Sequence, residues 1–127
     1  MSRGTVLYIE DNPENRLLVR RILEAEGYTV IEASDAPSGL QAATDSPPDL
    51  ILLDINLPEM DGYEFVSRLR GMEGLSDIPI VALTANVMKR DRERTLAAGC
   101  DGYIQKPIDV DELPRQIAGF IRKRSGS

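Results

Sequence analysis

Residues 50–62 read LILLDINLPEMDG, and this stretch combines a strongly apolar strand with a carboxylate at its end. The four residues 50–53 are all apolar and run directly into Asp54, after which Pro58 and Gly62 break the strand pattern. Continuously apolar strands are typical of parallel sheets that are covered on both faces. Because an unpaired buried charge is costly, we expect Asp54 to lie at the mouth of the strand with a counter-charge nearby.

Strand and helix patterns alternate on both sides of this stretch. Apolar, β-branched and aromatic runs predict four more strands, at residues 5–10, 28–33, 78–85 and 102–105. Helical signals follow each strand, at about residues 13–26, 35–46, 61–72, 87–98 and 113–121. Five strands alternating with five helices predict an α/β fold, with a parallel sheet and helices on both of its faces.

The first predicted helix has the clearest boundaries. Asn12 is a capping residue, Pro13 suits the first helical position, and Gly27 is a suitable residue for the C-terminal stop. The spacing of apolar residues predicts an inner face made of Leu18, Ile22 and Ala25. Asp61 and Glu64 form a capping pair that predicts the start of the third helix, whose inner face is expected to contain Phe65, Leu69 and Met72. The last helix is expected to bury four apolar residues, Leu113, Ile117, Phe120 and Ile121.

Composition limits the class of protein. The chain has 127 residues, a size that fits one domain, and we expect residues 1–127 to form it, with a core at about 5–123 and a tail at 124–127. No apolar run reaches the roughly 18–20 residues that a membrane span requires. The start of the chain lacks a signal-peptide pattern and Cys100 is the only cysteine, so we expect a cytoplasmic protein. The net charge of −6 argues against direct binding to nucleic acid.

The chain contains no histidine, which restricts its chemistry. This composition excludes Ser-His and Cys-His catalysis, histidine-based metal sites and a role as a phosphohistidine carrier. Carboxylates, hydroxyls and lysine therefore remain as the chemically active groups.

Polar residues that suit such chemistry stand at the carboxyl ends of four predicted strands. They are Glu10 and Asp11 at the end of the first strand, Asp54 at the end of the third, Thr84 at the end of the fourth and Lys106 after the fifth. In parallel α/β sheets, sites form beyond the carboxyl ends of the strands, so we expect these five residues to share one cleft.

This set of residues suits phosphoryl transfer. Three adjacent carboxylates repel one another unless a cation is present, and oxygen ligands favour Mg²⁺, with Mn²⁺ as the alternative ion. We interpret Asp54 as the nucleophile that becomes an aspartyl-phosphate. Asp11, Asp54 and the backbone carbonyl of Asn56 are the candidate metal ligands, and Glu10 is expected to position the ion, through water. Lys106 and Thr84 are expected to contact the phosphoryl oxygens.

The sequence strongly resembles the receiver domain of two-component response regulators. The matching pieces are YIEDN at residues 8–12, LLDINLPEMDG at 52–62, ALTA at 82–85 and GYIQKP at 102–107. In this order they cover the chain from about residue 5 to residue 123. The resemblance implies a flavodoxin-like doubly wound (βα)5 fold, with a five-stranded parallel sheet of order 2-1-3-4-5.

The resemblance also implies a signalling role rather than that of a conventional enzyme. The phosphoryl group would come from a sensor or hybrid histidine kinase or from a phosphotransfer protein, and the phosphorylated form would act on a downstream protein target. Tyr103 matches the switch aromatic, and the bond before Pro107 is expected to be cis. The changing surface would comprise the fourth helix, fifth strand and fifth helix, whereas the first helix, with Arg16 and Arg20, would be the kinase-docking surface.

Two alternatives use the same residues differently. A Mg²⁺-dependent phosphohydrolase with an aspartate nucleophile is disfavoured, because such enzymes of the haloacid dehalogenase type carry an acid two residues after the nucleophile, where this chain has Asn56. Their nucleophile also ends the first strand rather than the third. A pseudo-receiver, an interaction module without the chemistry, is disfavoured by the complete set of acidic, hydroxyl and lysine residues. The sequence leaves open whether the receiver acts alone or belongs to a larger chain.

Overall fold

The computed structural model describes residues 3–55, 62–75, 77–84, 93 and 96–125. Five parallel strands form a sheet of order β2-β1-β3-β4-β5, which confirms the predicted fold class and strand order. The strands are β1 (Thr5–Ile9), β2 (Thr29–Ala33), β3 (Leu50–Asp54), β4 (Ile80–Thr84) and β5 (Gly102–Gln105).

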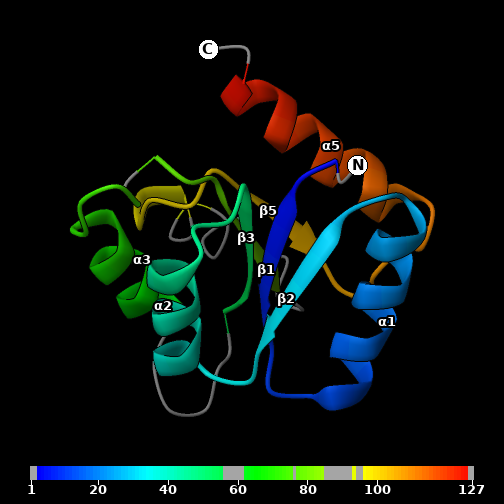
Figure 1. Ribbon diagram of the computed structural model, residues 1–127, viewed down its shortest axis with the longest axis horizontal. Coiled ribbons are helices and arrows are strands. Elements are labelled where there is room, and N and C mark those ends of the chain that lie inside the picture. Colours follow the sequence, from blue (N-terminus) through cyan, green and yellow to red (C-terminus); the bar gives the residue numbers. More distant parts are fainter. Residues whose placement is uncertain (1–2, 56–61, 76, 85–92, 94–95, 126–127) are drawn as a thin grey trace.

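Helices cover both faces of this sheet (Figure 1). They are α1 (Pro13–Ala25), α2 (Ala36–Asp45), α3 (Gly62–Arg70) and α5 (Glu112–Ser125). The helices α2 and α3 lie on one face, and α1 and α5 lie on the other. Most of the predicted fourth helix at 87–98 lies outside the described residues, and so does the predicted cap residue Asp61. None of the described helices combines the length and apolar character needed to cross a membrane.

Two apolar clusters, one on each face, form the core. The cluster under α2 and α3 includes Leu7, Leu53 and Phe65, and the cluster under α1 and α5 includes Tyr8, Leu52 and Ile117. All five residues of β3 and all five of β4 are buried. Alternating residues of each strand therefore contribute to opposite clusters, as expected for a sheet covered on both faces.

The start and the end of α1 agree with the prediction, but of its predicted inner face only Ile22 is buried. The side chain of Asn12 accepts hydrogen bonds from the backbone N–H groups of Glu14 and Asn15, and Gly27 has a φ of 95° just beyond the helix. The buried residues of α1 are Val19, Ile22 and Leu23. The predicted positions Leu18 and Ala25 are exposed. Residues 17–19 are all apolar, so either of two neighbouring faces of the helix could pack against the sheet, and the face that contains Val19 does so.

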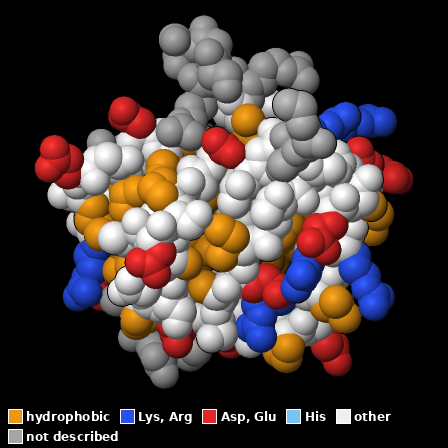
Figure 2. All heavy atoms as spheres, in the orientation of Figure 1, with side chains coloured by type: hydrophobic (Ala, Val, Ile, Leu, Met, Phe, Trp, Pro, Cys, Tyr) orange, Lys and Arg blue, Asp and Glu red, His pale blue; other side chains and the backbone are white. Residues whose placement is uncertain are grey.

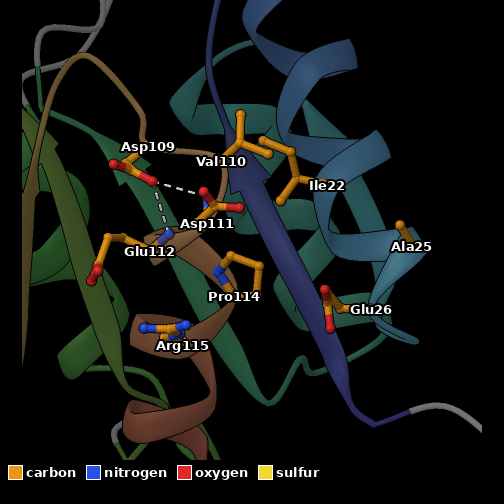
Figure 3. A pocket seen from close by; sticks show the side chains of 9 residues that line it. All are labelled: Ile22, Ala25, Glu26, Asp109, Val110, Asp111, Glu112, Pro114 and Arg115. Atoms are coloured by element: carbon orange, nitrogen blue, oxygen red, sulfur yellow. Dashed lines mark hydrogen bonds between the residues drawn. The ribbon is translucent and has the colours of Figure 1, made fainter.

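The last helix is preceded by a capping residue, Asp109, that was not predicted from the sequence. The Asp109 carboxylate accepts hydrogen bonds from the backbone N–H groups of Asp111 and Glu112 at 2.9 and 3.0 Å (Figure 3). The helix starts at Glu112, so Pro114 lies in the first turn, where its missing N–H is not needed for an intrahelical bond. Leu113 and Ile117 are buried as predicted, whereas Phe120 and Ile121 are only partly buried.

The side chain of Arg70 connects three segments of the chain at the amino end of the sheet. The Arg70 guanidinium, at the end of α3, donates to the carbonyl oxygens of Ile78 and Gly99 and pairs with the Asp101 carboxylate at 2.8 Å. The same carboxylate also accepts from the backbone N–H of Ile80. This network fixes the chain just before β4 and β5, at the edge opposite Asp54.

A pair of glycine variants tests the packing between α2 and the sheet. A Cβ atom on Gly39 would collide with Ile9, which is fully buried, whereas a Cβ on Gly119 in α5 would meet nothing within 4 Å. Both substitutions to alanine gain similar helix propensity, about 1 kcal/mol. Overpacking should therefore make the free energy of unfolding of Gly39→Ala about 1–3 kcal/mol lower than that of Gly119→Ala, measured by urea denaturation. Equal values for the two variants would contradict the packing described here.

Candidate metal centre

The structure places Asp54 at the carboxyl edge of the sheet with a lysine beside it. Asp54 is the last residue of β3 and is only 4% exposed. The ammonium nitrogen of Lys106 lies 3.2 Å from its Oδ2 atom. Lys106 follows β5, and its backbone N–H donates to the carbonyl oxygen of Thr84, so β5 and β4 together bring the lysine to the end of β3. The expected counter-charge is therefore present.

Two further carboxylates lie next to Asp54. Oxygen atoms of Glu10, Asp11 and Asp54 all lie within 4.8 Å of one another, and Glu10 is 2% exposed. The Lys106 nitrogen is 3.6 Å from Oε2 of Glu10. Three carboxylates cannot all be charged at this distance without a strong cost, and one lysine compensates only part of it. An oxygen-only donor set of this kind fits a hard divalent cation, and Oε2 of Glu10 is buried without a hydrogen-bond partner among the described residues.

Glu10 is held by the first turn of α1. The side chain of Asn15 donates to its Oε1 atom at 3.1 Å, and Arg16 donates to its backbone carbonyl oxygen at 2.6 Å. Burial raises the pKa of Glu10 to about 7, and the neighbouring Asp54 adds to the rise, whereas Asn15 and Lys106 oppose it. A proton therefore relieves the crowding of the carboxylates in the metal-free protein. Asn15 was not among the predicted site residues, although its position three residues after the Asn12 cap places it on the side of α1 that starts next to Glu10.

Of the other predicted site residues, Thr84 lies at the same edge and Tyr103 lies within β5. Thr84 ends β4 and is 6% exposed. Tyr103 is half-buried on β5 and packs against the core cluster under α2 and α3. The peptide bond between Lys106 and Pro107 is cis, the isomer implied by the resemblance. Asn56, whose backbone carbonyl was a candidate ligand, lies outside the described residues.

Comparison with known proteins gives consistent results. A family model described as response regulator receiver domain matches residues 6–118. The polar-differentiation response regulator DivK of Brucella ovis is 41% identical over 117 residues, which cover 92% of this chain and 95% of the relative.

Solved structures show the same fold. The chemotaxis response regulator CheY4 of Vibrio cholerae has a TM-score of 0.88 and 29% identity, covering 92% of this chain and 98% of that one. The receiver domain of the sensor histidine kinase PA1611 of Pseudomonas aeruginosa PAO1 has a TM-score of 0.86 and 36% identity, covering 94% and 98%. That structure has a magnesium ion coordinated in its active site cleft.

Proposed function

This chain belongs to the response regulator receiver domain family, and from this premise we propose that it is the phosphoacceptor of a two-component phosphorelay, with Asp54 as the phosphorylated residue. One observation carries the proposal. Asp54 is almost completely buried, yet it lies 3.2 Å from an ammonium group and within 4.8 Å of two other carboxylates. On this proposal residues 1–127 act as one receiver domain with a core at about 5–123.

The transfer step follows from the position of Asp54. A carboxylate oxygen of Asp54 attacks the phosphorus atom of a phosphohistidine on the donor protein, forming an O–P bond as the N–P bond breaks. The electron pair of the broken bond returns to the imidazole nitrogen, which takes up a proton. The rigid end of β3 holds the nucleophile in place, so that catalysis consists mainly of positioning and charge stabilisation.

A divalent cation completes the site in this proposal. Glu10, Asp11 and Asp54 would hold Mg²⁺, together with the backbone carbonyl of Asn56, and Mn²⁺ has a similar preference for oxygen ligands. When bound, the ion neutralises charge that develops on the phosphoryl oxygens. The Mg²⁺ in the related PA1611 receiver domain supports this assignment.

Lys106 and Thr84 would receive the remaining phosphoryl oxygens. The Lys106 ammonium group, already at 3.2 Å from Asp54, supplies a fixed positive charge, and the Thr84 hydroxyl supplies a hydrogen bond. We propose that movement of Thr84 toward the phosphoryl group lets Tyr103 turn inward and changes the surface of β5 and α5. The part of that surface formed by residues 87–98 lies mostly outside the described residues.

The partners proposed are proteins. A histidine kinase, either a sensor or a hybrid, or a phosphotransfer protein would donate the phosphoryl group, and a downstream protein would bind the switched surface. On the face drawn in Figure 2, Lys and Arg side chains are scattered among Asp and Glu side chains, which does not favour nucleic acid as a partner.

The donor would dock on α1, the helix that carries Arg16 and Arg20. Arg16 bonds to the Glu10 carbonyl oxygen, and Arg20 pairs with Glu24 and Glu32 at 3.2 Å, so both guanidinium groups already have partners within the chain. Leu17 and Leu18, next to these arginines in the sequence, are exposed by 47% and 42% and would add apolar contact area. Beside them, a groove of about 640 Å³ runs between α1 and the start of α5, with Ile22 and Val110 among its apolar lining residues (Figure 3).

Incubation with acetyl phosphate followed by intact-protein mass spectrometry tests the proposed function. We expect one phosphoryl group per chain in the presence of Mg²⁺ and none in its absence. Continuous release of phosphate from a large excess of an added phosphate ester would instead favour the phosphohydrolase. If neither acetyl phosphate nor beryllofluoride changes the protein, the pseudo-receiver becomes the better interpretation.

A further inference from the structure

Tyr8 in β1 has a buried hydroxyl group that the proposed mechanism does not use. Its side chain is 0% exposed and is among the largest fully buried side chains. No atom of the described residues forms a hydrogen bond with its hydroxyl oxygen. Buried polar groups almost always have a partner, so an orphaned hydroxyl in a well-packed sheet indicates a partner outside the protein atoms themselves.

The position of Tyr8 links this hydroxyl to the metal centre. Side chains two residues apart on a strand point to the same face, so Tyr8 and Glu10 share the face under α1 and α5. Tyr8 pairs with Leu52, so the next row on this face contains Glu10 and Asp54, about 7 Å farther along the strands. A tyrosine side chain spans most of that distance when it leans along its strand.

The hydroxyl of Tyr8 acts as a donor under all ordinary conditions. Burial raises the pKa of Tyr8 far above its usual value, and the charges of Glu10 and Asp54 raise it further. A tyrosine hydroxyl is in any case protonated near neutral pH and can donate a hydrogen bond.

A second orphaned atom lies in the row above. Oε1 of Glu10 accepts a hydrogen bond from Asn15, but Oε2 has no hydrogen-bond partner among the described residues. The Lys106 ammonium group lies 3.6 Å from Oε2, a distance within ion-pair range but too long for a good hydrogen bond. These two unpartnered polar atoms, which belong to side chains on one face of β1, could both be satisfied by one molecule.

We propose that Tyr8 is a positioning residue of the metal centre, which acts through one buried water molecule. The water accepts a hydrogen bond from the Tyr8 hydroxyl and donates one to Oε2 of Glu10. Buried water molecules in proteins make two to four hydrogen bonds. The bridge fixes the Glu10 carboxylate from below and so holds it in one orientation toward the cation.

The expected effect of Tyr8 on Mg²⁺ affinity rests on the proposed function, whereas the hydrogen bond from its hydroxyl to the water does not. If Tyr8 only filled space, phenylalanine would serve as well, and removing the orphaned hydroxyl would leave the protein equally or more stable. If the bridge exists, its removal loosens Glu10. Partners that orient metal ligands commonly change metal affinity by about tenfold or more when they are removed.

Two conservative variants separate these cases. Tyr8→Phe removes the hydroxyl and keeps the ring, and Tyr28→Phe is the matched control, because Tyr28 packs in the same core cluster but lies next to the amino end of β2. For each protein, Mg²⁺ affinity is measured by calorimetry and the melting temperature without metal by circular dichroism. The Raman tyrosine doublet is recorded without metal as a difference spectrum, wild type minus Tyr8→Phe, which isolates the hydrogen-bonding state of one tyrosine.

The proposal predicts that the difference spectrum is that of a tyrosine hydroxyl that donates a hydrogen bond. Tyr8→Phe should have about tenfold lower Mg²⁺ affinity and a lower melting temperature than the wild type, whereas Tyr28→Phe should have unchanged affinity. A spectrum of a hydroxyl without a partner, together with wild-type affinity in Tyr8→Phe, would overturn it and leave the proposed function intact. Absence of Mg²⁺ binding to the wild-type protein would overturn the metal role of Tyr8 and the proposed function together, while the Raman spectrum would still decide whether the bridge exists.

Discussion

Asp54→Asn is expected to reduce phosphoryl uptake from one group per chain to none while the fold is retained. An amide is a far weaker nucleophile than a carboxylate and forms no stable acyl phosphate, so the reaction loses its acceptor. Asparagine has nearly the same shape as aspartate and fits the same space at the end of β3. Removing one of three crowded carboxylates relieves repulsion, which offsets the loss of the ion pair with Lys106 at 3.2 Å, so the variant should remain folded without metal.

The same chemical change elsewhere provides the control. Asp35 caps α2 by accepting a hydrogen bond from the Ser38 backbone N–H at 2.8 Å, and asparagine caps helices about as well. Asp35→Asn should therefore take up phosphate like the wild type in intact-mass measurements with acetyl phosphate and Mg²⁺. Persistent uptake by Asp54→Asn would show that another residue is the acceptor.

The second large effect is a dependence of metal-free stability on pH. Burial and the nearby Asp54 raise the pKa of Glu10 from 4.5 to about 7, so the folded protein keeps a proton that the unfolded chain has already lost. Between about pH 4.5 and pH 7 the folded state binds more protons than the unfolded state, and the free energy of unfolding falls as pH rises. The difference between the two pKa values corresponds to at most about 3 kcal/mol.

Bound Mg²⁺ should reverse this trend. The cation binds the deprotonated carboxylates, so its stabilising effect grows as pH rises through 7. Urea midpoints at pH 5, 6, 7 and 8, with EDTA or with saturating Mg²⁺, measure both effects. Glu10→Gln carries no titrating group at this position, so the decline with pH should be weaker in this variant without metal. Parallel pH profiles of the wild type and Glu10→Gln would contradict the raised pKa of Glu10.

Much of the fold was predictable because its signals are local. The fully apolar runs of β3 and β4 indicated a sheet covered on both faces, and the Asn12 cap and Gly27 marked the limits of α1. Alternation of strands and helices then required parallel pairing, which brings all carboxyl ends to one edge. The closeness of Glu10, Asp11, Asp54 and Lys106 followed from this topology rather than from any one motif.

Features that depend on tertiary packing were not predictable. The choice of Val19 rather than Leu18 for the inner face of α1 depends on how the helix rotates against the sheet. Arg70 and Asp101 are far apart in sequence, and nothing in their local patterns indicates that they meet. The unpartnered hydroxyl of Tyr8 was not predictable either. A tyrosine in a strand can simply fill space in the core, and the sequence does not distinguish that role from one that uses its hydroxyl.

Chemical trapping of the phosphorylated residue tests the central claim most directly. After reaction with acetyl phosphate, borohydride reduces an aspartyl-phosphate to homoserine, and peptide mass spectrometry then locates the changed position. We predict homoserine at position 54 in the sample that contains Mg²⁺ and unmodified aspartate there in the sample with EDTA. Homoserine at position 11, or trapping at position 54 that does not depend on a divalent cation, would contradict the proposed mechanism.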